Sequence, residues 1–326
     1  MIWFRLAILF LALLIDKAVG DPPRLWARVP HPVVLFGKAV AAADRRLNVP
    51  GLPPAAARSR GILAAVLLTV LALACGVLIS AVFSGLWAIG LFMEVCVVAI
   101  LLAQKSLADH VGAVAFALNE EGLTGGRREV AMIVGRDPQT LDAAGVSRAA
   151  IESLAENYSD GVVAPAFWYM LLGLPGLFAY KMINTADSMI GHKSEKYLYF
   201  GWASARWDDL VNLLPARASA VFIALAAWTA EGFAAMKRSL RTAIVDHGKH
   251  RSPNSGWPEA AMAGAINVQL AGPRVYHGEL VNEEMLNIGG RRHASSSDIR
   301  RAIRVFDHAC YWLAGFVCAL LALQIA

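Results

Sequence analysis

Six apolar stretches, separated by polar segments, divide the chain of 326 residues. A helix that crosses the hydrocarbon core of a bilayer needs about 20 predominantly apolar residues, and each stretch approaches or exceeds that length. The pattern predicts an all-α, polytopic helical integral membrane protein that forms a single membrane domain over residues 1–326. The expected spans lie near residues 2–19, 61–83, 85–104, 161–179, 218–235 and 306–325, with polar loops at residues 20–60, 105–160, 181–217 and 237–305.

Two of these stretches differ from a simple span. Residues 2–19 could instead be a cleaved signal peptide, because the small residues at 18–20 loosely fit a cleavage site. The charges of Asp16 and Lys17 just before that site, and the lack of a basic leader, favour a retained helix. The fourth stretch predicts a broken or re-entrant helix, because it is interrupted by Pro165, Gly173, Pro175 and Gly176.

Positive charge in the polar segments predicts their side of the membrane. Residues 20–60 hold seven Lys and Arg residues against two Asp residues, and residues 237–304 are similarly basic. Cytoplasmic loops carry such an excess, so we expect both segments, and the helical loop 105–160, to lie in the cytoplasm of a bacterium. The chain would then be a multi-pass protein of the inner membrane. The membrane side of residues 181–217 is not decided by the sequence. Counting spans places this segment in the periplasm, whereas its candidate chemistry requires substrates that are in the cytoplasm.

The composition supports a membrane protein and excludes other classes. Charged residues make up 17% of the chain and hydrophobic residues 57%, whereas soluble domains carry roughly a quarter charged residues. No basic run is interleaved with aromatic residues, so we expect no nucleic-acid partner. The four cysteines lie in apolar stretches without a C-x-x-C pair, and they are expected to be small buried hydrophobes: Cys75, Cys96, Cys310 and Cys318.

Acidic side chains form the first group with candidate chemistry. Glu152, Glu156 and Asp160 recur at every fourth position, which places them along one face of a helix. A solvated helix face is the simple explanation. However, this stripe runs into an apolar stretch, and carboxylates at a membrane boundary are costly unless they bind something. We therefore expect Glu152, Glu156 and Asp160 to be catalytic, with Asn157 beside them in contact with substrate.

A second polar group occupies the segment between the fourth and fifth stretches. Adjacent Asp residues are followed one turn later by Asn212, and Asp187 follows Asn184 by three residues. Hard oxygen ligands of this kind suit Mg²⁺ that bridges phosphates. Ordinary polarity of a helix surface is the alternative explanation. The metal-binding candidates are Asp187, Asp208, Asp209 and Asn212.

A third polar group, residues 246–265, combines basic residues with a tight turn. Pro253, Gly256 and Pro258 define the turn, and the pattern up to Glu259 reads as the start of a helix. Backbone N–H groups at a helix start favour an anion, and Arg251 lies close by in sequence. A surface turn without function has the same composition, so this motif is weak when taken alone.

Taken together, these blocks resemble the CbiB/CobD family of cobalamin biosynthesis. They occur in the family's order along nearly the whole chain, which makes the resemblance specific. Tyr158 departs from the small or β-branched residue expected there. The blocks are Gly20–Pro22 with Pro30–Val33, Gly135–Asp137, Glu152–Asn157 with Asp160–Gly161, Asn184–Met189 with Gly191–Lys193, Phe200–Arg206 with Asp208–Asp209, Pro215–Arg217, and His250–Glu259.

The resemblance implies an adenosylcobinamide-phosphate synthase, an acid–amine ligase that joins adenosylcobyric acid to (R)-1-amino-2-propanol O-2-phosphate. ATP and Mg²⁺ are the implied cofactors, and other late enzymes of the pathway are possible partners besides the substrates and the bilayer. The chain has no G-x-x-x-x-G-K-[ST] motif, so ATP binding rests on the resemblance alone.

Chemistry assigns provisional roles within this activity. A carboxylate must be activated before an amine attacks it, and the amine must be neutral, so we expect Glu152 or Glu156 to act as a base. A metal ligand is the equally open alternative for either residue. Arginine forks bind phosphate bidentately, and Arg206 is the expected clamp for the phosphate of the amine substrate. Its alternative role is an ion pair with Asp209 that only orders the helix. The substrate-binding candidates are Asn157, Asn184, Lys193, Ser204, Arg206, Arg217, Arg251, Ser252, Asn254 and Glu259.

Two other functions share parts of this pattern. An intramembrane prenyl- or alcohol-phosphotransferase would also use Asp-rich motifs and Mg²⁺, but the Asp208-Asp209-x-x-Asn212 motif occurs once. A transporter would need paired broken helices in two repeated halves, and one broken stretch is evident. Turnover that depends on a corrinoid would separate these possibilities.

Overall fold

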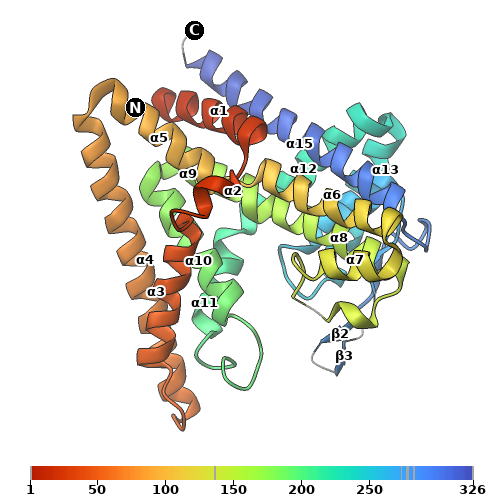
Figure 1. The fold of residues 1–326 in the computed structure, drawn as a ribbon, viewed down its shortest axis with the longest axis horizontal. Coiled ribbons are helices and arrows are strands. Elements are labelled where there is room, and N and C mark those ends of the chain that lie inside the picture. Colours follow the sequence, from red (N-terminus) through yellow and green to blue (C-terminus); the bar gives the residue numbers. More distant parts are fainter. Residues whose placement is uncertain (1, 136, 273, 277–278, 282, 325–326) are drawn as a thin grey trace. The chain divides into compact units, whose positions relative to one another are not determined.

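Helices make up nearly all the regular structure of the computed structural model (Figure 1), which describes residues 2–135, 137–272, 274–276, 279–281 and 283–324. Arg136, in the predicted Gly135–Asp137 block, lies outside the described residues. The helices are α1 (Ile2–Val19), α2 (Pro23–Trp26), α3 (Pro32–Leu47), α4 (Pro54–Gly85), α5 (Trp87–Leu101), α6 (Gln104–Glu120), α7 (Gly122–Val130), α8 (Ala143–Tyr158), α9 (Ala164–Leu172), α10 (Leu174–Ile190), α11 (Trp202–Val211), α12 (Leu213–Glu231), α13 (Phe233–Asp246), α14 (Gly256–Ile266) and α15 (Ser296–Leu323).

Short elements complete the description. Two 3-10 helices, η1 (Pro138–Thr140) and η3 (His247–Lys249), and a π-helix, η2 (Ser159–Val163), lie between the α-helices. Strand β1 (Leu270–Ala271) pairs with β4 (Met285–Leu286), and β2 (Arg274–Tyr276) pairs with β3 (Glu279–Val281), both antiparallel. The predicted all-α class is confirmed, with these strands as a minor addition.

Four helical segments among the described residues are long and apolar enough to cross a membrane: Pro54–Gly85, Trp87–Glu120 (which comprises α5 and α6), Leu213–Glu231 and Ser296–Leu323. The chain is therefore a polytopic helical membrane protein, as predicted. Two of the expected spans are not among the four. The stretch 2–19 carries Arg5, Asp16 and Lys17, and the stretch 161–179 is divided into α9 and α10.

The described chain forms two compact units. Unit 1 comprises residues 1–103, 164–212 and 317–326, and unit 2 comprises residues 104–163 and 213–316. In unit 1, α10 packs against α3, α4, α9 and α11. The outer face of α4 exposes apolar residues such as Leu67, Val70 and Leu78, as expected of a helix in contact with lipid.

The break in the fourth apolar stretch lies at Gly173, as its prolines and glycines predicted. Gly173 has φ +70°, which is outside the helical region, and α10 restarts directly after it with Pro175 in its first turn. A helix that ends leaves carbonyl groups without intrahelical partners. Arg5 Nη1 of α1 donates to one of them, the oxygen of Leu171, over 2.7 Å. The first helix of the chain therefore stabilises the end of α9.

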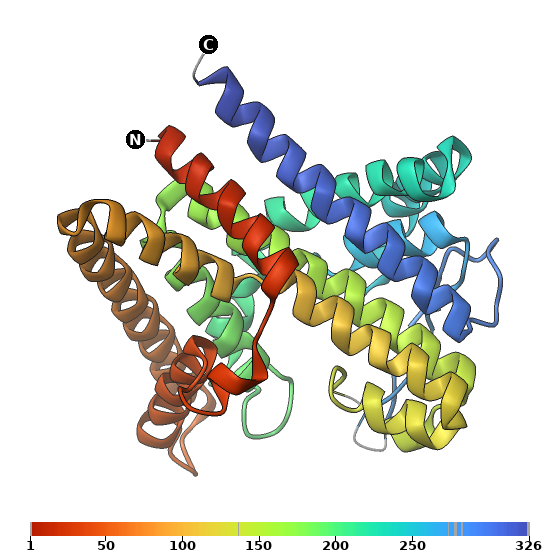
Figure 2. The same ribbon diagram turned by 45° about the horizontal axis from the view of Figure 1, so that its top comes forward.

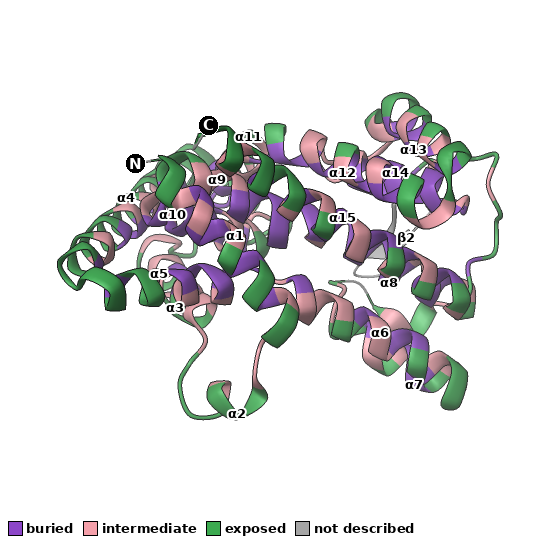
Figure 3. Ribbon diagram, turned by 90° about the horizontal axis from the view of Figure 1, so that it is seen from above, coloured by how far each residue is buried: buried purple, intermediate pink, exposed green. Residues whose placement is uncertain are grey.

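Unit 2 is built around two helices that carry predicted site residues. α8 packs against α6, α7 and α14, and Figure 2 shows α6 and α8 side by side. α14 is enclosed by α8, α12 and α13 and is buried along nearly its whole length, purple in Figure 3. The hydroxyl of Tyr158 donates to the oxygen of Ala309 over 2.9 Å in this core, so the large residue at position 158 is accommodated.

The exposure of the cysteines differs from the sequence prediction that all four are buried. Cys310 is buried as predicted, but Cys75 and Cys318 are exposed and Cys96 is intermediate. Cys75 lies on α4 and Cys318 on α15, both of which are candidate membrane spans. An apolar thiol on such a helix can face lipid, because lipid tails are as apolar as a protein core.

Candidate functional site

The predicted metal-binding residues of unit 1 come from two neighbouring helices. Asn184 and Asp187 lie on α10, and Asp208 and Asp209 on α11; we call these four residues the α10–α11 cluster. The side-chain amide of Asn184 donates to Asp208 Oδ1 over 3.2 Å. The packing of α10 against α11 thus brings together residues that are 24 positions apart in the sequence.

Arg206 forms an ion pair with Asp209, which is the role that the sequence left open as the alternative to a phosphate clamp. Its Nη1 lies 3.0 Å from Asp209 Oδ2, one turn along α11. Burial raises the pKa of the Asp209 carboxyl, and the positive charges of Arg206 and Lys193 lower it only in part, so the pKa is above its usual value. The cationic surroundings of Asp209 are therefore too weak to offset its desolvation, and a bound cation would favour its ionised form.

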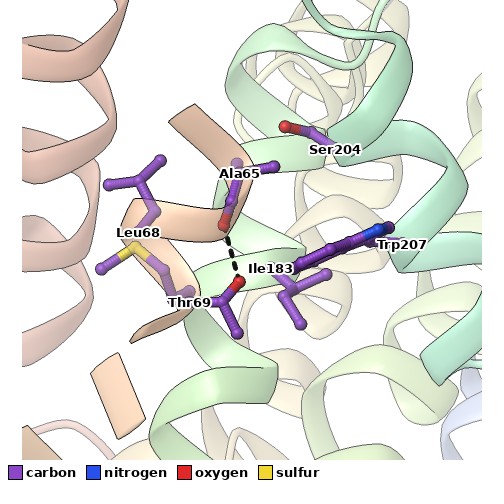
Figure 4. Close-up of a pocket in the computed structure, with 8 residues that line it drawn as sticks. Ala65, Leu68, Thr69, Ile183, Ser204 and Trp207 are labelled. Carbon is purple, nitrogen blue, oxygen red and sulfur yellow. Dashed lines mark hydrogen bonds between the residues drawn. The ribbon is translucent and has the colours of Figure 1, made fainter. Parts of the chain in front are cut away.

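Asn212 and Ser204 lie in more enclosed surroundings. Asn212 is 1% exposed, and its Oδ1 accepts a hydrogen bond from the hydroxyl of Tyr180 over 3.1 Å. Ser204 is also buried and lines a small pocket between α4, α10 and α11, together with Thr69 and Trp207 (Figure 4). The other residues that line this pocket are mainly apolar. Both residues therefore take part in packing between helices.

The donor set of the α10–α11 cluster limits the kind of metal site it could form. Within the described part of the chain, no three His, Cys, Asp or Glu side chains are grouped so that they alone could hold a metal ion. Mg²⁺ is commonly held by one or two carboxylates together with substrate phosphates and water. Asp208 and Asp209 fit that kind of site, and they do not fit a metal site made wholly of protein ligands.

In unit 2, the acidic residues of α8 have different partners. Glu152 is buried, and its Oε1 accepts a hydrogen bond from the backbone N–H of Ala271 over 2.7 Å. Glu156 is partly exposed, and its Oε1 accepts a hydrogen bond from the hydroxyl of Ser255 over 2.9 Å. Asn157 donates to the backbone oxygen of Ser153. Glu152 and Glu156 are therefore one turn of α8 apart, but the first carboxylate lies in the core and the second lies at the start of α14.

The predicted acidic stripe does not continue regularly to Asp160. α8 ends at Tyr158, and Asp160 lies in the π-helix η2. A π-helix has wider turns than an α-helix, so regular α-helical spacing holds from Glu152 to Glu156 but not as far as Asp160. Single π turns inside helices occur frequently at functional sites.

The segment before α14 folds into a hydrogen-bonded turn. Ser252 Oγ accepts hydrogen bonds from the backbone N–H groups of Asn254 and Ser255, each over 3.2 Å. His250 Nδ1 accepts one from the backbone N–H of Ser252, which requires an unprotonated Nδ1. His250 Nε2 lies 3.6 Å from Oε1 of the buried Glu259. With Nδ1 unprotonated, the N–H of the neutral ring is at Nε2, facing Glu259.

Two arginines approach this turn. Arg217 of α12 reaches Asn254 Oδ1 at 3.5 Å and lies over the ring of Trp257, 5.0 Å from its centroid. Arg251 is exposed, and its Nε lies 3.7 Å from Glu283. Glu156, Ser252, Asn254, Ser255 and Arg217 form what we call the α8–α14 cluster.

Sequence reasoning missed several residues of these sites. Trp257 stacks on His247 with ring centroids 3.9 Å apart, besides its contact with Arg217. Glu283 and Tyr180 also contact predicted site residues. Trp257 and His250 could have been chosen, because both lie inside the block His250–Glu259 that carried the resemblance. The roles of Tyr180 and Glu283 depend on contacts between distant segments.

Comparisons with known proteins agree with the motifs. The sequence matches the family described as CobD/Cbib protein over residues 9–306. A cobalamin biosynthesis protein CobD of Sinorhizobium sp is 60% identical over 97% of this chain and 98% of its own length. Proteins of the same name from Rhizobium meliloti and Brucella suis biovar 1 are 59% and 51% identical, over 94% and 97% of this chain and 93% and 96% of their own lengths. No solved structure gives a significant match. The chain therefore belongs to the CobD/CbiB family of cobalamin biosynthesis proteins.

Proposed function

We propose that the α8–α14 cluster binds the amine substrate of an adenosylcobinamide-phosphate synthase and that the α10–α11 cluster binds a Mg²⁺–nucleotide. The family assigns the overall activity, amide-bond formation in cobalamin biosynthesis. The substrates would be adenosylcobyric acid and (R)-1-amino-2-propanol O-2-phosphate. The observation that carries the proposal is the hydrogen bond between Glu156 and Ser255, which places a partly exposed carboxylate at the start of α14.

Glu156 is the proposed general base. An amine attacks an activated carboxylate only in its neutral form, so a carboxylate within reach must accept its proton. Glu152 is less suited to this role, because it is buried and accepts a hydrogen bond from Ala271. Ser255 fixes one oxygen of Glu156. We place Asp160 near the amine as a further negative charge that would attract its ammonium form.

The phosphate of the amine substrate would lie between the arginines and the turn before α14. Arg217 is partly buried and its guanidinium is oriented by Asn254, Trp257 and the oxygen of Leu213. A guanidinium held in one direction can bind two phosphate oxygens at once. Ser252 and Arg251 would supply further donors from the turn, and Glu259, held by His250, would shape its inner side.

The α10–α11 cluster fits a metal ion that arrives with a nucleotide. Asp208 and Asp209 would hold Mg²⁺, with Asp187 nearby and Asn184 orienting Asp208. Asn212 has a supporting role in this proposal, because its Oδ1 already accepts a hydrogen bond from Tyr180. Lys193 and Arg206 lie close enough for their charges to act on Asp209 and would contact the phosphates. When bound, Mg²⁺–ATP would supply the phosphoryl group that activates the carboxylate.

The activity also implies a location and partners. Both substrates and ATP are cytoplasmic in a bacterium, so we propose that the protein lies in the inner membrane with both clusters facing the cytoplasm. Other late enzymes of the pathway are proposed partners, because the corrinoid substrate and product must pass between enzymes.

An assay of purified protein in detergent tests the proposal. With adenosylcobyric acid, the amino-alcohol phosphate and Mg²⁺–ATP, we expect one amide product for each ATP consumed. Removing any of the three should stop product formation. Full turnover without a nucleotide would reject the assignment of the α10–α11 cluster, and full turnover of Glu156→Gln would reject the proposed base.

A further inference from the structure

The segment that joins α10 to α11 folds into a closed loop within unit 1. It runs over residues 191–201, from the end of α10 at Ile190 to the start of α11 at Trp202, and Figure 1 shows it as the green loop next to α11. Gly201 makes this closure possible, because a Cβ at this position would collide with the backbone oxygen of Ile190. The two ends of the loop are therefore in contact, which defines a compact Ω-type loop.

One carboxylate from another helix holds this loop. Asp44 Oδ2 of α3 accepts hydrogen bonds from Lys196 Nζ over 2.8 Å and from the hydroxyl of Tyr197 over 3.2 Å. Asp44 Oδ1 accepts one from Asn48, whose side chain also reaches the oxygen of Lys196 at 3.4 Å. The side chain of Asp44 is only 13% exposed, whereas that of Lys196 is 59% exposed, so a largely buried carboxylate holds the surface loop.

The charge of Asp44 is well stabilised. Burial alone would raise its pKa, but the hydrogen bonds from Lys196, Asn48 and Tyr197 and the charge of Lys196 hold the pKa below its usual value. Asp44 therefore stays ionised at neutral pH and remains a charged acceptor for the loop. Hydrogen bonds to an ionised acceptor are roughly twice as strong as those between neutral groups.

The loop carries Lys193, three residues before Lys196. Lys193 is exposed, and its charge acts on Asp209 of the α10–α11 cluster. The position of its ammonium group is set only by the loop, since a lysine side chain is itself flexible.

We propose that Asp44 is a positioning residue: by tethering Lys196 and Tyr197 it fixes the loop that presents Lys193 to the nucleotide phosphates. This inference rests on the proposed phosphate role of Lys193. Without Asp44 the loop would take several conformations, of which only a fraction would place Lys193 correctly. The apparent affinity of a ligand falls in proportion to that fraction.

The test uses the full-length protein in detergent with Mg²⁺–ATP and adenosylcobyric acid as the titrated substrates. We expect Asp44→Asn and Lys196→Met each to raise the KM for Mg²⁺–ATP about tenfold, as for a loop ordered one-tenth of the time. The kcat at saturation and the KM for the corrinoid should stay within about twofold. Trypsin should cleave the loop faster in both variants. The double variant should be no worse than Asp44→Asn alone, because Asp44 accepts both hydrogen bonds of the tether and Lys196→Met removes only one of them.

Asp109→Asn is the matched control, because it removes another Asp–Lys pair, with Lys105, that is exposed on α6 of unit 2. It should change neither KM nor cleavage. Lys193→Met tests the phosphate site separately from the Asp44 tether. An unchanged KM for Mg²⁺–ATP in Lys193→Met would overturn the proposed phosphate site itself.

A raised KM in Lys193→Met with a normal KM in both tether variants would overturn only the role of Asp44. Equal shifts for both substrates would also overturn it, since they would indicate general damage. If Asp44→Asn does not fold, Lys196→Met decides the question alone, because Lys196 is 59% exposed and its loss leaves the core intact.

Discussion

The hydroxyl of Ser255 donates a hydrogen bond to Glu156 Oε1 over 2.9 Å, although 99 positions separate the two residues. This contact joins the acidic stripe of α8 to the first turn of α14. A carboxylate that keeps one oxygen fixed and remains partly exposed is well placed to accept a proton from a bound amine.

Replacing this carboxylate should affect chemistry and not folding. Glu156→Gln keeps the size and the hydrogen bond from Ser255 but removes the base, so we expect turnover to fall roughly 100-fold or more. The melting temperature should change little. Glu152→Gln is the contrasting variant, because its buried acceptor serves Ala271; weakening that bond should cost about 1–3 kcal/mol of stability. If Glu152→Gln instead lost turnover and Glu156→Gln lost stability, Glu152 would be the base and Glu156 the structural residue.

The metal role of Asp208 and Asp209 can be tested in the same assay. Asp208→Asn and Asp209→Asn should each abolish turnover while expression and stability in detergent stay nearly intact. Raising the Mg²⁺ concentration should partly rescue one variant. Full activity of both variants at low Mg²⁺ would remove metal binding from this motif.

The pKa of Asp209 gives a prediction for stability. Its folded pKa is raised above the ordinary value near 3.8, so the folded state binds a proton more tightly than the unfolded state. The stabilisation from this proton is complete below the unfolded pKa and is lost as pH rises through the folded pKa. Without Mg²⁺, wild type should lose more stability than Asp209→Asn over that window in thermal unfolding. Parallel curves would contradict the raised pKa.

Replacing each of the two arginines near the clusters should affect the KM for the amino-alcohol phosphate differently. Arg217→Lys should raise the KM for the amino-alcohol phosphate at least tenfold, about 1.4 kcal/mol, because lysine cannot form the fork or stack on Trp257 in the same way. Arg206→Lys serves as the control, since lysine can keep the exposed ion pair with Asp209, and such pairs contribute at most about 1 kcal/mol. If Arg206→Lys alone raises that KM, the clamp lies in unit 1, as the sequence first suggested.

Single cysteines at Ser194 and Ser255 should report which side of the membrane each cluster faces. Both should react with a membrane-impermeant thiol reagent only when it can enter the cytoplasm, because ATP and the corrinoid are found there. The exposed Cys75 and Cys318 must first be replaced by serine. Labelling of Ser194→Cys from the periplasm would place the α10–α11 cluster away from its nucleotide.

Local sequence signals predicted the helices and the family well. Prolines and glycines around Gly173 predicted the break between α9 and α10, because their backbone preferences act locally. The π-helix had no such signal, so the sequence placed Asp160 on the same α-helix as Glu152 and Glu156. That the chain forms a single membrane domain over residues 1–326 remains a prediction.

Pairings between distant segments could not be predicted from one sequence. The bond between Glu152 and Ala271 spans 119 positions, and the one between Asp44 and Lys196 spans 152. Each depends on how helices pack, which spacing within one segment does not encode. The catalytic role that residue type suggested for Glu152 remains a prediction, and its bond to Ala271 is a packing contact that the sequence did not indicate.

The contact between Arg5 and Leu171 has a consequence for the biogenesis of the protein. Arg5 of α1 is synthesised 166 residues before its backbone partner Leu171. At a synthesis rate of about 5–20 residues per second, that interval lasts roughly ten to thirty seconds. During this time the guanidinium of Arg5 must find other hydrogen-bond acceptors or remain solvated. α1 can therefore make this contact only after residues 164–172 have been synthesised.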